Sequence, residues 1–114
     1  MHTSKSNGGG TWLTGVGCCT TGNNQTKESS ILDSKNKVVT YILSAGAYVS
    51  DNASSSAKLY GSNNKSSWSE VASLSGWANT THNKTGTLQS YRYYKCICKS
   101  GPLQNSSSAS VFIN

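Results

Sequence analysis

The cysteines have the most distinctive chemistry in the sequence, and they fall into two pairs, Cys18 with Cys19 and Cys96 with Cys98. A zinc site of four thiolates usually has two residues between the cysteines of a pair, which turns both sulfurs toward one ion. Neither pair has this spacing, so we expect no metal. The main expectation is reduced, buried thiols that act as small apolar core residues. A disulfide between the early and the late pair is the alternative.

Side chains that could act as acids or bases are few and scattered. They are Glu28, Asp33, Asp51, Glu70, His2 and His82. A Ser–His–Asp site requires a histidine that is oriented by a carboxylate, and no local motif supports one. Calcium bound at Asp51 stays an alternative, although calcium sites usually gather several carboxylates. We therefore expect a protein that is not an enzyme and that uses no cofactor.

Aromatic side chains in polar segments give the best candidates for ligand binding. Trp77 lies in a polar segment, and together with Tyr48 and Tyr60 it could stack on a sugar ring. Tryptophan and tyrosine suit this role because each combines a large apolar face with a polar group. The alternative is that Trp77 caps the end of the fold, while Trp12 and Trp68 pack in the core or at its rim.

The composition indicates one small domain rich in β-structure. Ser, Thr, Asn and Gly dominate, and all four are unfavourable inside helices. Charged residues make up only 12% of the chain, which also has three Trp and six Tyr, so we do not expect disorder. The net charge of +6 is spread without a cluster, which argues against a nucleic-acid partner.

Targeting signals are also missing from the sequence. No apolar run approaches the roughly 18 residues of a membrane span, and the first ten residues lack the apolar segment of a signal peptide. We therefore expect a complete chain that is made in a cytosol and does not insert into membranes.

Hydrophobic alternation predicts short strands separated by polar loops. In residues 91–99, Tyr94, Cys96 and Cys98 fall on one face and should point to the core, whereas Lys95 and Lys99 should face solvent. The other predicted strands are 11–20, 31–33, 37–50 with a bulge or bend at Gly46, 57–61, 68–74 and 109–113. The strand at 37–50 is apolar on both faces and should be central in its sheet. Residues 21–30 and 75–86 are predicted to be loops. This spacing is typical of an antiparallel β-sandwich or barrel.

Several of these segments resemble a known family. Residues 58–70 contain an apolar strand, an Asn- and Ser-rich turn and then Ser67-Trp68-Ser69, and this stretch resembles a hairpin of the discoidin family. These domains are also called coagulation factor V/VIII type C domains and belong to the galactose-binding-like jelly rolls. Residues 37–42, 91–95 and 109–113 are similar to three other strands of the family, in the same order. The resemblance implies an all-β jelly-roll sandwich, but nothing before Lys37 matches the family's ligand loops.

The N-terminal ten residues suggest an assembly element. Gly8, Gly9 and Gly10 bring no side chains, so this arm could lie in a groove of a partner or a symmetry mate. We therefore expect an arm at residues 1–10 and one sandwich domain at residues 11–114.

The leading hypothesis is a non-catalytic virion structural protein of a bacteriophage. It would be a decoration, head-fibre or tail-attached protein, made in the host cytoplasm and joined to other virion proteins or copies of itself through the arm. The alternative is a carbohydrate-binding module or adhesin, extracellular or at the cell surface, that acts as a lectin on a cell-surface glycan.

Overall fold

The computed structural model describes the chain except for residues 1, 8–10, 23, 48–54, 77–80 and 102–104. For residues 2–7, 11–13, 21, 22, 47, 76, 81 and 105 it describes the backbone alone. The described residues form strands, turns and bends without any helix. Accordingly, within them no helix is long and apolar enough to cross a membrane.

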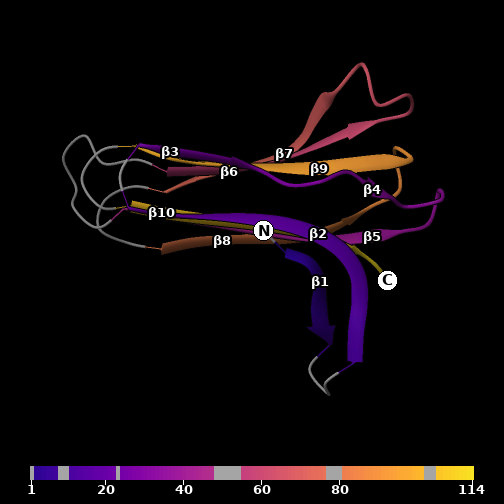
Figure 1. Cartoon of the computed structure of the whole chain (residues 1–114), viewed down its shortest axis with the longest axis horizontal. Helices are drawn as coiled ribbons and strands as arrows, with labels where there is room; N and C mark the ends of the chain where they lie inside the picture. The colour runs from indigo at the N-terminus through magenta and orange to yellow at the C-terminus, as the bar shows by residue number, and fades with distance from the viewer. Residues whose placement is uncertain (1, 8–10, 23, 48–54, 77–80, 102–104) are drawn as a thin grey trace.

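The described residues form ten strands in two antiparallel sheets that pack face to face (Figure 1). The first sheet has the order β1 (His2–Asn7), β2 (Thr11–Gly22), β10 (Asn105–Ile113), β5 (Val39–Ala47) and β8 (Thr81–Leu88). The second sheet has the order β3 (Gln25–Glu28), β9 (Tyr93–Ser100), β6 (Ser55–Ser62) and β7 (Ser69–Gly76), and the short β4 (Leu32–Asp33) also pairs with β9.

The order of the strands identifies the sandwich as a jelly roll. From β2 to β10 the chain alternates between the sheets, except at the step from β3 to β4 and at the β6–β7 hairpin. As a result β2 and β10, which are far apart in the sequence, lie side by side in the first sheet. This double-sheet arrangement is the one found in viral capsid and lectin domains. The predicted all-β sandwich of jelly-roll type is therefore confirmed.

The core lies between the two sheets and is built from alternate residues of the central strands. On β9 the side chains of Tyr94, Cys96 and Cys98 are fully buried, as predicted. From the first sheet Val111 lies between Val16 and Tyr41 on the neighbouring strands. The full cluster is Val16, Cys18, Leu32, Val39, Tyr41, Leu43, Ala57, Leu59, Ala72, Tyr94, Cys96, Cys98, Ala109 and Val111.

Most predicted strands are present, and β5 is central in its sheet between β10 and β8. Two predictions of loops are wrong. Residues 21–30 contain the end of β2 and all of β3, and residues 75–86 contain most of β8. Both missed strands lie at sheet edges and are polar, so they lack the apolar alternation that marks a strand with a buried face. Their backbones pair with β9 and β5 respectively.

Two local predictions also need correction. β5 pairs with β10 and β8 in an unbroken register through Gly46, so the predicted bulge is not there. A register shift occurs instead in the β6–β7 pair, between Leu59 and Tyr60. Lys99 is exposed as predicted, but Lys95 is half-buried because its side chain packs over Trp68 and pairs with Glu28.

Candidate functional site

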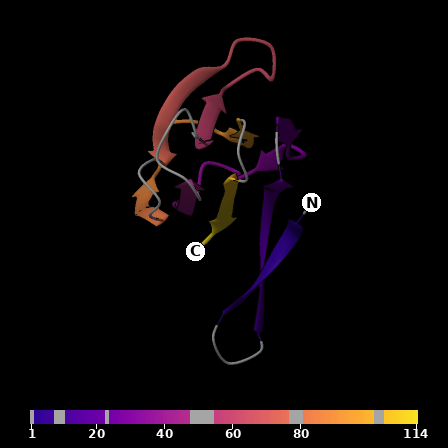
Figure 2. The ribbon, with the colours of Figure 1, turned by 90° about the vertical axis from the view of Figure 1, so that its left-hand side faces the viewer.

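The N-terminal hairpin is the feature that departs most from a plain sandwich. β1 pairs with β2 from Asn7↔Thr11 to His2↔Gly17. β10 pairs with β2 only from Gly15 onward, so residues 11–14 of β2 have β1 as their one described strand neighbour. Figures 1 and 2 show β1 and the first part of β2 extending away from the two sheets. We call residues 2–7 and 11–14 the N-terminal hairpin.

This hairpin has an exposed backbone edge. A two-stranded hairpin is marginally stable in water on its own, and an unpaired strand edge is a template for pairing with another chain. Sequence analysis predicted an arm at residues 1–10 that lies against a partner or a symmetry mate. In the structure residues 2–7 form a strand that pairs with β2 of the same chain. The proposed assembly residues Gly8, Gly9 and Gly10 lie outside the described residues.

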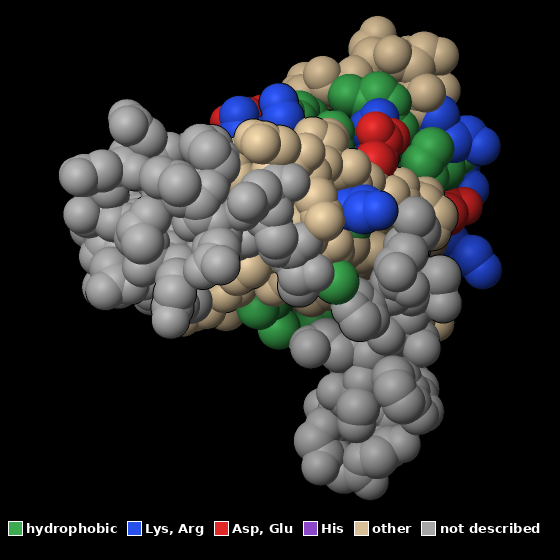
Figure 3. All heavy atoms as spheres, turned by 60° about the vertical axis from the view of Figure 1, so that its left-hand side comes forward, with side chains coloured by type: hydrophobic (Ala, Val, Ile, Leu, Met, Phe, Trp, Pro, Cys, Tyr) green, Lys and Arg blue, Asp and Glu red, His purple; other side chains and the backbone are tan. Residues whose placement is uncertain are grey.

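A second candidate is the outer face of the β3–β9–β6–β7 sheet, where aromatic and basic side chains alternate. We call this the aromatic–basic face and define it as Tyr60, Lys65, Trp68, Arg92, Tyr93 and Lys95. These residues come from β6, β9 and the loops beside them. Figure 3 shows basic, acidic and hydrophobic side chains next to one another on the upper part of the surface, where this sheet lies.

The aromatic rings of this face are already in contact with cations of the same chain. The Lys95 Nζ atom lies 4.5 Å from the centroid of the Trp68 ring. Over the Tyr93 ring the Lys65 Nζ and Arg92 Cζ atoms lie at 5.1 and 5.2 Å. Such contacts are worth about 0.5–1 kcal/mol at exposed sites. They also cover part of the ring surface that a sugar would use for stacking.

The acidic side chains near this face are held by the same or neighbouring cations. Arg92 forms a two-pronged pair with Asp33, in which Nε donates to Oδ1 at 3.0 Å and Nη2 to Oδ2 at 3.1 Å. The hydrogen bond from Arg92 lowers the pKa of Asp33, and Asp33 in turn raises the pKa of Arg92. The two further pairs are Lys58–Glu70 at 3.2 Å and Lys95–Glu28 at 3.1 Å.

The loop between β6 and β7 is fixed by side-chain hydrogen bonds. The hydroxyl of Ser62 accepts from the backbone N–H of Asn64 and of Lys65, at 3.1 and 3.0 Å. The Asn64 Oδ1 atom accepts from the N–H groups of Ser66 and Ser67, at 2.8 and 2.9 Å. Lys65 has a positive φ of 63°, as turns of this type require. The loop therefore places Lys65 over Tyr93.

The predicted ligand-binding residues do not form a described site. Tyr48 and Trp77 lie outside the described residues, and Tyr60 lies half-buried on β6 opposite Glu70 and Lys95. Sequence analysis assigned Trp68 to packing in the core or at its rim and did not single out Tyr93. The sequence places Tyr93 and Lys95 two residues apart, on the same face of one strand. Which side chains of other strands lie beside them depends on the register of the sheet.

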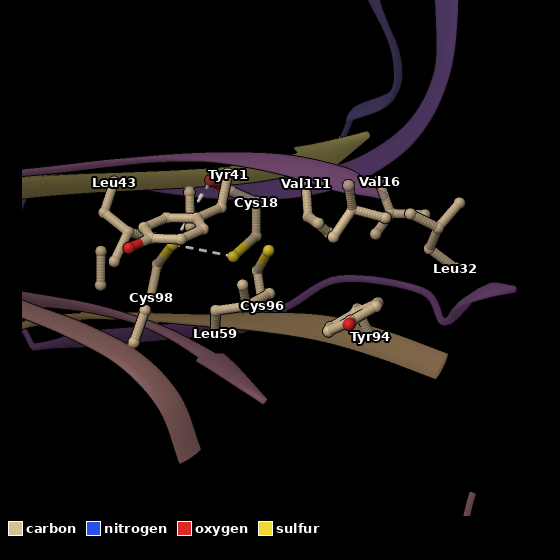
Figure 4. Close-up of a cluster of buried hydrophobic side chains, with 14 residues drawn as sticks. Val16, Cys18, Leu32, Tyr41, Leu43, Leu59, Tyr94, Cys96, Cys98 and Val111 are labelled. Atoms are coloured by element: carbon tan, nitrogen blue, oxygen red, sulfur yellow. Dashed lines mark hydrogen bonds between the residues drawn. The ribbon is translucent and has the colours of Figure 1, made fainter. Parts of the chain in front are cut away.

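The cysteines occupy the centre of the core. Cys18, Cys96 and Cys98 are buried, Cys19 is exposed, and all four are free thiols. Figure 4 shows Cys18 of β2 pointing toward β9, with its sulfur near that of Cys98. Burial raises the pKa of Cys96. Across the described residues, no group of three or more His, Cys, Asp or Glu side chains is placed to hold a metal ion.

Comparison with known proteins supports the fold. No protein-family model and no curated protein sequence matches this chain. The chain is similar in structure to the PBSX exported protein XepA, with a TM-score of 0.62 and 15% sequence identity over 99% of this chain. It spans 44% of the length of XepA. A weaker likeness is to the Yersinia pseudotuberculosis-derived mitogen, with a TM-score of 0.46, 12% identity and coverage of 90% of this chain and 87% of the mitogen. The resemblance to the discoidin family thus finds no support in a family model. The likeness to XepA supports the β-sandwich fold.

Proposed function

We propose that this chain is a non-catalytic structural component of a bacteriophage particle, and that the N-terminal hairpin joins it to a neighbouring subunit. The observation that carries the proposal is the hairpin itself, which extends from the sandwich with an open backbone edge. A further strand added to that edge would satisfy N–H and C=O groups that otherwise depend on water. The fitting partner is a second copy of this chain or another subunit of the particle.

Two further observations favour this proposal. The jelly roll is a frequent fold of viral capsid domains. XepA, by its name, is an exported protein of PBSX, and its likeness in fold is compatible with a location in a particle or outside the cell.

The rival function is carbohydrate binding. Tyr60, Trp68 and Tyr93 lie on one sheet face, and each offers a large apolar ring beside a polar group, which suits stacking on a sugar. However, Lys95 lies over Trp68, and Lys65 and Arg92 lie over Tyr93, so a sugar would have to displace these cations or use the other side of each ring. The geometry therefore favours assembly over glycan binding.

Deletion of residues 1–10 tests the proposal. The truncated and full-length chains are compared by sedimentation velocity for self-association and by co-purification with particles for incorporation. We expect the truncated chain to keep its sandwich, with little change in melting temperature, because the described core cluster begins at Val16. It should lose assembly.

The variants Trp77→Ala and Tyr60→Ala serve as controls for the rival function, and they should assemble as the full-length chain does. If the truncated chain assembles as well as the full-length chain, the hairpin is not the joining element and the proposal is wrong. Glycan binding that survives the truncation and is lost in either aromatic variant would establish the lectin function instead.

A further inference from the structure

Two of the buried cysteines face each other across the sandwich. Cys18 lies on β2 of the first sheet and Cys98 on β9 of the second, and their sulfur atoms are 2.8 Å apart. The Cys98 thiol also donates to the backbone carbonyl of Cys18 at 3.4 Å. The bonded distance in a disulfide is about 2.05 Å, so a shift of less than about 1 Å would bring the two sulfurs together. The dashed contact in Figure 4 marks this pair.

The other cysteine pairs are not placed to bond in this way. Cys19 follows Cys18 on the same strand and points to the opposite face, where it is exposed. Cys96 and Cys98 lie two residues apart on one extended strand, whose backbone holds their side chains side by side. Of the four thiols, only Cys18 and Cys98 have a hydrogen bond between their sulfurs.

We propose that Cys18 and Cys98 are a site of disulfide formation that joins the two sheets of the sandwich. The oxidant is a small disulfide such as oxidised glutathione. The Cys18 thiolate attacks one sulfur of the oxidant, which forms a mixed disulfide and releases one molecule of the reduced thiol. The Cys98 thiol then gives up its proton and attacks the Cys18 sulfur, and the second reduced thiol leaves. Two protein thiols are oxidised, and one oxidant molecule is reduced to two thiols.

The chemistry of the pair suits this sequence of steps. The hydrogen bond from Cys18 to Cys98 lowers the pKa of Cys18 and raises that of Cys98, so of the two thiols Cys18 loses its proton more readily. The thiolate is the reactive form of cysteine. Both side chains are buried, at 1% and 0% exposure. Glutathione therefore cannot reach them in the closed sandwich. The first exchange takes place during folding or opening, when β2 and β9 already face each other but the core is still accessible.

Refolding in the presence of oxidant tests the proposal on the full chain. The protein is refolded from denaturant in a buffer of oxidised and reduced glutathione, then unfolded without reductant in N-ethylmaleimide and weighed by mass spectrometry. The wild type should carry two maleimide groups, on Cys19 and Cys96, instead of four. Cys96→Ala keeps the proposed pair and should carry one, whereas Cys18→Ala and Cys98→Ala each break the pair and should carry three.

Protein refolded with excess reductant is the matched control and should carry four groups. A far-ultraviolet circular dichroism spectrum typical of β-structure confirms that each variant has folded, and Cys96→Ala keeps the test valid if a variant at Cys18 or Cys98 does not fold. Four groups on the oxidised wild type, or three on Cys96→Ala, would overturn the proposal. The double variant Cys18→Ser/Cys96→Ser keeps only Cys19 and Cys98 and should carry two groups. No group on it would mean that Cys19 and Cys98 bond, which would overturn the assignment to Cys18 and Cys98.

Discussion

The hydroxyl of Ser29 should be worth far more to stability than its size suggests. Ser29 is buried between the end of β3 and the start of β4. Its hydroxyl accepts a hydrogen bond from the backbone N–H of Cys96 at 2.8 Å and donates one to the carbonyl of Ser30 at 2.7 Å. The Ser29 N–H donates in turn to the Cys96 carbonyl at 2.9 Å. The side chain thus continues the pairing along β9 where β3 leaves it.

Replacing Ser29 with alanine removes the hydroxyl that accepts the hydrogen bond from the Cys96 N–H, and this N–H is left without an acceptor. Cys96 is fully buried, so water does not take the place of the hydroxyl. An unsatisfied buried donor costs roughly 1–3 kcal/mol. For a domain of this size, each kcal/mol lowers the melting temperature by about 4 °C. We therefore expect the melting temperature of Ser29→Ala to fall by about 4–12 °C.

Urea unfolding monitored by tryptophan fluorescence measures the change in free energy of unfolding. Ser30→Ala is the matched control because Ser30 is exposed and contributes its carbonyl to this network. The control should stay within about 0.5 kcal/mol of the wild type. In Ser29→Ala the Cys96 amide should also exchange with deuterium sooner. If the two variants were equally stable, the hydroxyl would not be needed for pairing along β9.

Three further predictions concern the packing, the ion pairs and the thiols. Gly61→Ala should lower the free energy of unfolding, measured in urea, by about 1–3 kcal/mol. The cause is a clash, because the new Cβ would lie 2.4 Å from the Cδ2 atom of the Tyr91 ring. An unchanged free energy would mean that the ring moves freely. The ion pair with Arg92 lowers the pKa of Asp33 in the folded protein. The pair therefore stabilises the fold fully above the pKa of an unfolded aspartate, about 4, and this contribution is lost as the pH falls through the lowered pKa. The melting temperatures of the wild type and Asp33→Asn should therefore converge in acid, and an equal gap at every pH would contradict this. N-ethylmaleimide should add one group to the folded wild type, at the exposed Cys19, and no group to the folded Cys19→Ser variant. Reaction at a buried cysteine would show that the core opens.

The sequence predicts the strands that have a buried face much better than those at the sheet edges. In β9 the alternation places Tyr94, Cys96 and Cys98 inward, and the structure agrees. β8 contains Lys84, Asn83 and several threonines, and the sequence gives no sign that it forms a strand. Its position comes from the backbone pairing with β5, which no local pattern encodes. Polar edge strands of this kind also discourage unwanted pairing between molecules.

The candidate surfaces depend on register, which explains why sequence analysis found only parts of them. Tyr60 was identified, but its neighbour Lys95 lies on a strand more than thirty residues away. The shift between Leu59 and Tyr60 decides which residues of β7 lie beside them, and it has no clear signal in the sequence. The assembly role predicted for the Gly-rich segment stays a prediction, and the pairing of β1 with β2 could be found only in the three-dimensional structure.

The place of β10 has a consequence for the synthesis of this protein. β10 is the last of the ten strands to leave the ribosome, and it lies in the middle of the first sheet, paired with β2 on one side and β5 on the other. Until residues 105–113 emerge, β2 and β5 have no strand between them, and β10 does not yet hold Cys18 of β2 opposite Cys98 of β9. The first sheet can therefore be completed, and the sandwich closed around the thiols, only after β10 has been translated.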